Sequence, residues 1–245
     1  MPMRTIARPT FAALILFVTT SVLAETTHDS YESLFESAIN AIAWDIHEEW
    51  AFTETASGSD GDFVSRYDPR GPDGERWTLL SIDGREPTDE EAATYAKDKD
   101  GEHFGDNDDD EDNDVDAMVE PGTLQLVEET DDYWLLSFVP TDDDEEDDEV
   151  GRKVLQSMDG TVKIVKDGEY LEFIDIHNDK PFKPKFGVKM SKFLMRMTFG
   201  PAIDDGPVVM KSMDVAIKLR AFLVVRVNEA ESVRFSDFEY AGDGP

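Results

Sequence analysis

Apolar residues near the start of the chain recur with the spacing of one face of a helix. Between Ser30 and Trp44 (SYESLFESAINAIAW) the stripe consists of Leu34, Phe35, Ala38, Ile39 and Ile42. This period predicts an amphipathic helix, and Asp29 or Ser30 supplies the side-chain oxygen expected at its N-cap. We therefore expect an N-terminal helix that buries one face.

From Trp50 the apolar period changes to two, which is typical of half-buried strands. WAFTETA and FVSRYDP are short alternating runs separated by SGSDGD, and this order predicts a hairpin. The turn DPRGPDGE follows, and then a strand from Trp77 to Asp83. Thr88 and Glu91 have the spacing of a capping box, which predicts a short helix that ends near Lys99.

The second half of the chain is mostly strand sequence. Residues 123–129 and 133–140 predict another hairpin. From Arg152 to Tyr240 the chain reads as nearly continuous strand, divided by turns that contain Gly or Pro. Every odd position from Val215 to Val227 is apolar, so we expect one long strand with one dry face.

A change of parity marks another long strand, Phe186 to Phe199. Its apolar positions are even up to Met190 and odd from Phe193, so we expect a bulge or sharp bend near Ser191 and Lys192. Bulged long strands build curved sheets. The predicted fold class is α+β: a strongly curved antiparallel β-sheet, or half-barrel, with an N-terminal helix and a short helical lid.

The first 24 residues have the features of a secretory signal peptide. Arg4 and Arg8 precede an apolar run, and small residues before Ala24 suit a signal peptidase. The run is shorter than the roughly 20 residues of a spanning helix. We expect cleavage near Ala24, a periplasmic or secreted bacterial protein that does not span the membrane, and one domain over residues 25–245.

The chain is strongly acidic, with a formal net charge of -33. It contains no cysteine. Acidic tracts lie within residues 105–120 and 141–150, which we interpret as solvated loop insertions. Excess acid elsewhere suggests adaptation to high salt. A phosphate backbone would be repelled, so nucleic acid is not an expected partner.

Catalytic and metal-binding motifs are not found in the sequence. The four histidines have no metal-ligand spacing, and no nucleophile elbow or phosphate loop occurs. A calcium loop that started at Asp109 would lack the required Gly, because Asp114 stands there. We expect no enzyme, no cofactor and no metal. If the chain is an enzyme nevertheless, His47 or His177 beside a carboxylate is the first place to look.

Large apolar side chains are the strongest candidates for a binding site. A long curved sheet has more inner face than two short helices cover, and hollows of this kind bind lipid or acyl chains. Methionine adds a soft, adaptable surface. The candidate lining residues are Trp50, Phe52, Phe63, Tyr67, Trp77, Trp134, Phe138, Phe193, Met195, Met197 and Phe199.

The order of elements resembles the lipoprotein-carrier superfamily, the LolA/LolB-like half-barrel. The resemblance rests on RYDP followed by GERWTLLSIDGREPT, and on RAFLVVRVNEAESVRFSDFEY near the C-terminus. It implies an exported, non-enzymatic carrier or chaperone that holds a lipid or acylated ligand in the concave face of the sheet. The alternative is a structural or interaction protein with a filled core and acidic, salt-adapted or cation-binding loops.

Four arginines are concentrated in the connector between residues 66 and 85, namely Arg66, Arg70, Arg76 and Arg85. They could pair with local carboxylates and fix the loop. Alternatively, they could form a basic rim for an anionic headgroup.

Overall fold

The computed structural model describes residues 28–101, 115–141, 149–222 and 225–242. The predicted signal peptide lies outside these residues, as do most of the two acidic tracts. The helices are α1 (His28–Asn40), α2 (Asp89–Gly101), η1 (Asp116–Met118) and α3 (Glu149–Leu155). The strands are β1 (Trp50–Gly58), β2 (Gly61–Tyr67), β3 (Trp77–Ile82), β4 (Gln125–Glu129), β5 (Tyr133–Phe138), β6 (Asp159–Val165), β7 (Tyr170–His177), β8 (Val188–Pro201), β9 (Val208–Ala221) and β10 (Val225–Tyr240).

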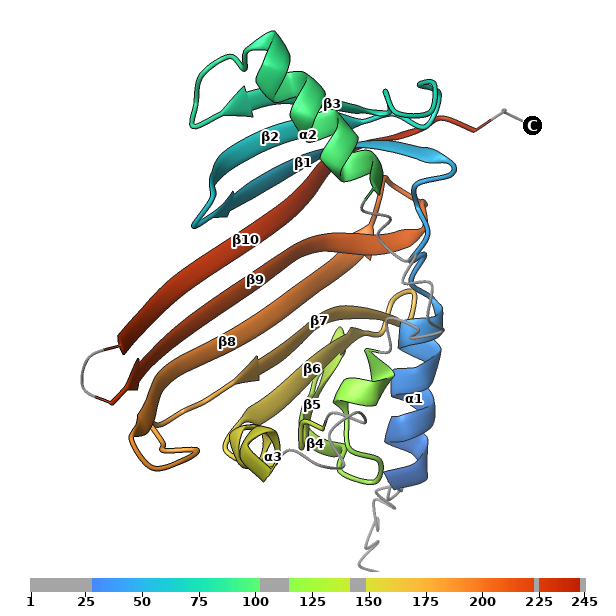
Figure 1. Cartoon of the computed structure of the whole chain (residues 1–245). Helices are drawn as coiled ribbons and strands as arrows, with labels where there is room; N and C mark the ends of the chain where they lie inside the picture. Colours follow the sequence, from blue (N-terminus) through green and yellow to red (C-terminus); the bar gives the residue numbers. More distant parts are fainter. Residues whose placement is uncertain (1–27, 102–114, 142–148, 223–224, 243–245) are drawn as a thin grey trace, which may run out of the picture.

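All ten strands form one antiparallel sheet in the order β3-β2-β1-β10-β9-β8-β7-β6-β5-β4. The two edge strands, β3 and β4, do not meet, so the sheet is not closed into a barrel (Figure 1). The pairing of β1 with β10 joins the first hairpin to the end of the chain. One large antiparallel sheet with few helices confirms the coarse fold class.

One row of paired residues crosses the whole sheet and is apolar in every strand. From β3 to β4 it consists of Ile82, Phe63, Ala56, Val233, Met213, Met197, Ile174, Val162, Leu136 and Leu126. Residues directly opposite each other in an antiparallel pair point to the same side. We call this side the inner face and the other side the outer face.

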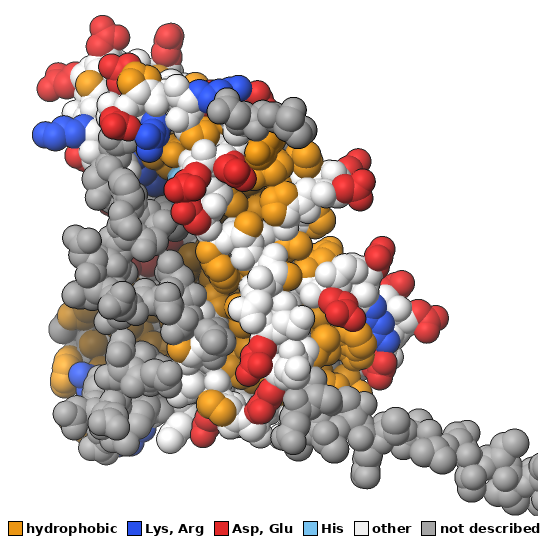
Figure 2. Space-filling view, turned by 90° about the vertical axis from the view of Figure 1, so that its right-hand side faces the viewer, with side chains coloured by type: hydrophobic (Ala, Val, Ile, Leu, Met, Phe, Trp, Pro, Cys, Tyr) orange, Lys and Arg blue, Asp and Glu red, His pale blue; other side chains and the backbone are white. Residues whose placement is uncertain are grey.

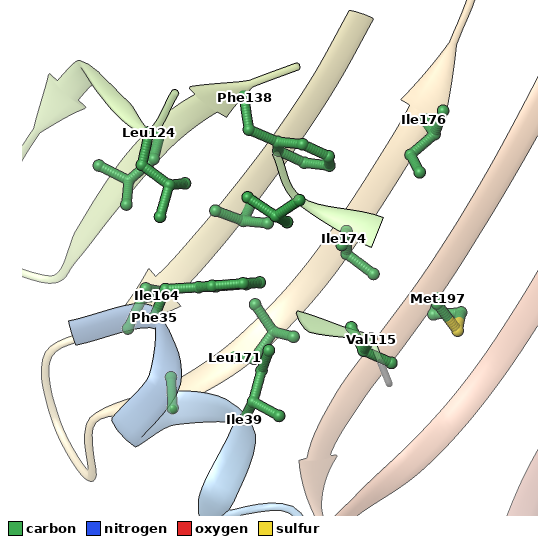
Figure 3. Close-up of a cluster of buried hydrophobic side chains, with 14 of the residues drawn as sticks. Phe35, Ile39, Val115, Leu124, Phe138, Ile164, Leu171, Ile174, Ile176 and Met197 are labelled. Carbon is green, nitrogen blue, oxygen red and sulfur yellow. The ribbon is translucent and has the colours of Figure 1, made fainter. Parts of the chain in front are cut away.

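Both long helices lie on the inner face. Helix α1 packs its predicted stripe on β5 to β7, and Figure 3 shows Phe35 and Ile39 among side chains of the sheet that include Ile164 and Leu171. Helix α2 lies over β1 to β3, where Tyr95 stacks on Phe63 with ring centroids 6.1 Å apart (Figure 1). The two helices therefore cover opposite ends of one sheet face.

The predicted bulge in the long strand is confirmed. The pairing of β8 with β9 shifts between Met190 and Lys192, so Ser191 is the extra residue. Because of this shift, Met190 before the bulge and Phe193 after it both lie on the inner face. The parity change in the sequence therefore had a structural cause.

Two expectations about the strands are wrong. Residues 152–155 belong to α3, not to a strand, and Val215 to Val227 is divided between β9 and β10. The chain turns after Ala221, where Phe222 has a positive φ of 48°. A residue other than Gly rarely adopts this conformation, and the turn has no Gly, Pro or Asn to announce it.

The end of the predicted insertion 105–120 is part of the core. Val115 and Val119 are buried in the same cluster as α1, so they are not solvated. The two valines interrupt the acidic run, and burial of apolar surface favours packing them inside.

Candidate functional site

Four of the eleven candidate lining residues lie in a filled aromatic cluster at the α2 end of the inner face. Trp50, Phe52, Tyr67 and Trp77 are all buried there. Phe52 stacks on Tyr67 with ring centroids 5.2 Å apart, and the Tyr67 hydroxyl donates a hydrogen bond to the carbonyl of His47, at 2.8 Å. These side chains fill the core and offer little surface to a ligand.

Another group lies in the larger cluster that α1 covers. Phe138, Met197 and Phe199 are buried there, and Trp134 is partly buried at its margin. The Trp134 indole donates a hydrogen bond to Glu129, at 3.1 Å, and the Lys166 ammonium lies 4.6 Å from its ring centroid. Phe63, as described above, lies beneath Tyr95.

Between the two clusters runs a strip of inner-face side chains that are only half-buried. We call it the inner apolar strip, and it consists of Phe193, Met195, Met213, Val215, Ile217 and Val233. On the side of the molecule that Figure 2 faces, apolar side chains are exposed between acidic ones. Val215 and Ile217 belong to neither cluster. Of the eleven candidates, Phe193 and Met195 are in this strip.

Val215 and Ile217 were not among the eleven candidates, although their alternation placed them on one dry face. Their partners on β10 are Glu231 and Glu229, which are exposed on the same face. The strip therefore has an acidic border along β10. Alternation in β9 was the signal that could have identified these two residues.

Helix α2 is attached to the sheet by polar contacts of Tyr95 and Lys99 and by the stacking of Tyr95 on Phe63. Glu54 on β1 is 2% exposed, and the Lys99 ammonium lies 3.0 Å from its Oε1. The Tyr95 hydroxyl lies 2.9 Å from Ser65 Oγ and 3.3 Å from Glu54 Oε1. Buried carboxylates need such partners. The sequence contained a signal for this site, because Glu54 follows Trp50 and Phe52 at the spacing of one strand face.

A polar pocket of about 380 Å³ lies on the outer face of β6 to β8. The Asp175 carboxylate is buried in its floor, 2.6 Å from His177 Nδ1 and 2.8 Å from Arg196 Nε. His177 was expected to be of interest beside a carboxylate, and the structure places it there. A carboxylate on Nδ1 fixes the orientation of an imidazole, as in many acid–base sites.

The second ring nitrogen of this histidine also faces a carboxylate. His177 Nε2 lies 3.4 Å from Asp179 Oδ1, and the Arg196 guanidinium lies 4.9 Å from the centroid of the Phe173 ring. The arrangement is an ion cluster that ties β7 to β8. In the described parts of the chain, no group of three His, Asp or Glu side chains is arranged to hold a metal ion.

The four arginines of the connector pair with carboxylates. Arg76 pairs with Asp73, and Arg85 pairs with Glu91. Arg66 and Arg70 both reach Glu239 on β10, at 3.3 Å. Arg70 also binds Asp68, and this hydrogen bond lowers the pKa of Asp68. The pairing of these arginines with carboxylates is therefore confirmed, and Arg66 and Arg70 connect this segment to β10.

Comparison with known proteins gives no relative: the chain matches no protein-family model, and no curated protein or solved structure is significantly similar to it. Among the residues that the structure describes, no helix is long and apolar enough to cross a bilayer.

Proposed function

We propose that the protein is an exported carrier that holds a lipid or acylated ligand against the inner face of a curved half-barrel. The observation that carries this proposal is the inner apolar strip, whose side chains are half-buried between two packed clusters. An acyl chain that lay along the strip would remove this apolar surface from water, and each buried methylene contributes about 0.8 kcal/mol. Methionines in the strip can adapt to chains of different shape.

Helix α2 is suited to the role of a lid in this proposal. Its sequence, DEEAATYAKDKDG, has no large aliphatic side chain, and its attachment rests on Tyr95 and Lys99. A helix held by a few polar contacts can separate from a sheet at a smaller cost than one with a broad apolar face. Movement of α2 would uncover the neighbouring end of the inner face.

The acidic border narrows the class of ligand. Glu229 and Glu231 lie opposite Ile217 and Val215 on the inner face, so an anionic headgroup at that border would be repelled. We therefore favour a ligand with a zwitterionic or cationic headgroup over a free fatty acid. Fluorescent lysophosphatidylethanolamine and a fluorescent fatty acid are two probes that separate these classes.

A matched pair of variants on one strand tests the site. Val215→Asp places a charge on the inner apolar strip, whereas Ala216→Asp places the same charge on the outer face one residue away. We expect the first variant to weaken lysophosphatidylethanolamine binding at least tenfold, roughly the effect of losing one buried apolar side chain. The second should bind like the wild type. Equal affinity in both variants would contradict the proposed site.

The second candidate function is that of an interaction protein, in which the protein's own side chains fill the core over the inner face. It is favoured by the burial of seven of the eleven candidate residues inside the two clusters. This candidate predicts that neither probe binds to the wild type.

A further inference from the structure

The start of β8, the end of β9 and the start of β10 lie together, away from α1 and α2 (Figure 1). Phe186 is 95% exposed, Phe222 is 61% exposed and Val225 is 52% exposed. The backbone amide of Phe222 donates a hydrogen bond to the carbonyl of Gly187, at 2.7 Å, so the loop before β8 and the turn after β9 lie side by side. Large exposed apolar side chains that gather in one place mark an interaction site.

Phe222 has an unfavourable backbone conformation. Its φ of 48° lies in the left-handed region, which bulky residues rarely adopt and which is concentrated at functional sites. The Phe222 ring lies so close over Gly187 that an added Cβ there would overlap it. Gly187 therefore allows the ring to bridge the two loops.

Cations line the outer face of the sheet next to this apolar end. Lys189, Arg220 and Arg226 are directly opposite one another in β8, β9 and β10, and Lys192 is opposite Lys218 nearby. Like charges in such positions destabilise a sheet. Residues 180–192, 218–222 and 225–228, at this end of the strands, contain eight basic and no acidic residues, in a chain with 23 basic and 56 acidic residues. The charge of this end is therefore opposite to that of the whole chain.

These cations also differ from the connector arginines. Each of the four connector arginines forms an ion pair. Within the described ranges, no ion pair involves Lys183, Lys185, Lys189 or Arg226, which are all exposed. These four side chains are therefore suited to an external anion.

We propose that this end of the molecule, the basic tip, docks on an anionic lipid bilayer. It consists of Phe186, Phe222 and Val225 with Lys183, Lys185, Lys189 and Arg226. The cations meet lipid phosphates, and the phenyl rings enter the boundary between headgroups and acyl chains.

Because the basic tip contains both exposed phenyl rings and cations, an anionic bilayer fits it better than an acidic polypeptide does. An acidic polypeptide, including the chain's own acidic tracts, would satisfy the cations but would leave the exposed rings in water. The net charge of -33 does not prevent docking, because salt screens charges beyond about 8–10 Å. The inference does not depend on the proposed ligand, since the basic tip and the inner apolar strip are different surfaces.

Flotation with lipid vesicles tests the basic tip. We expect the wild type to float with vesicles that contain phosphatidylglycerol, and to bind vesicles of phosphatidylcholine alone at least tenfold more weakly. Phe186→Ser with Phe222→Gly should reduce binding about tenfold or more. Glycine at 222 also relieves the positive φ, so this variant should fold. Lys189→Gln with Arg226→Gln should give a similar loss and remove the preference for phosphatidylglycerol.

Matched controls lie at the opposite end of the sheet. Leu80→Ser removes another exposed apolar side chain, on β3, and Lys97→Gln removes an exposed cation on α2. Both controls should bind as the wild type does. Failure of the folded wild type to float, or equal losses in the tip and control variants, would overturn the proposal. Flotation only after residues 142–149 are replaced by neutral residues would also overturn it, because the tip would then be occupied by the chain itself.

Discussion

The ammonium of Lys99 on α2 lies 3.0 Å from the buried carboxylate of Glu54 on β1. The same ammonium lies 5.2 Å from the centroid of the Trp77 ring, so it connects α2 to the aromatic cluster. Glu54 occupies an inner-face position that apolar residues occupy elsewhere in the sheet. This ion pair is a main polar attachment of the helix that we propose as a lid.

Removal of one partner of this pair should destabilise the fold. Lys99→Met leaves the Glu54 carboxylate buried without its cation, and the expected loss in the free energy of unfolding is about 3 kcal/mol. Urea denaturation measures this loss. Lys97→Met, at an exposed position of the same helix, should change stability by less than about 0.5 kcal/mol.

The double variant separates pairing from packing. Glu54→Leu with Lys99→Met removes both charges, while Tyr95 keeps its contact with Ser65. Replacing a buried pair by apolar residues is often neutral, so most of the lost stability should return. A double variant as unstable as Lys99→Met alone would show that the carboxylate was not the source of the loss.

The start of α2 should contribute to stability in a pH-dependent way. A hydrogen bond from Arg85, together with those from Thr88, lowers the pKa of Glu91 from 4.5 to about 2. Because the folded pKa is lower than the unfolded one, the contribution is fully present above about pH 4.5 and is lost as the pH falls toward 2.

A comparison with Glu91→Gln isolates this contribution. Glutamine can keep the capping-box hydrogen bond but not the ion pair with Arg85. The wild type should be the more stable protein at pH 6, and the difference should vanish as the pH falls through the window from 4.5 to about 2. If the difference in stability between the wild type and Glu91→Gln does not change with pH, the ion pair with Arg85 is not its cause.

Gly160 should tolerate no larger residue. It is directly opposite Phe138, and a Cβ on Gly160 would overlap the Phe138 ring. Gly160→Ala should therefore lower the free energy of unfolding by about 1–3 kcal/mol through overpacking. The added variant Phe138→Leu should recover part of that loss, as thermal or urea unfolding can measure. If the two substitutions lower the free energy of unfolding additively, the added Cβ does not overlap the Phe138 ring directly.

Local pattern explains much of what the sequence predicted correctly. The capping box of Thr88 and Glu91 forms as expected, with the Thr88 amide donating to Glu91 Oε2 at 2.8 Å. The bulge at Ser191 followed from parity alone, since a one-residue shift reverses the faces of a strand. Features that depend on neighbours within a few residues could therefore be predicted from the sequence.

The pairing of strands that lie far apart in the chain could not be predicted from the sequence. The pairing of Trp50 with Tyr240 joins the two ends of the domain, and no local signal specifies it. The turn at Phe222 was missed because tertiary contacts with Gly187, and not turn residues, hold it. Likewise, apolar composition could not separate Phe52, which fills the core, from Met195, which is half-buried on the strip.

Native mass spectrometry of residues 25–245, produced in a bacterial periplasm and purified gently, tests the central claim most directly. We predict extra mass that matches a phospholipid or acylated species and that disappears after solvent extraction. The Val215→Asp variant should carry much less of this mass, and Ala216→Asp should carry as much as the wild type. An unliganded wild type that takes up no lysophosphatidylethanolamine would contradict the carrier function and would favour the interaction protein with a filled sheet.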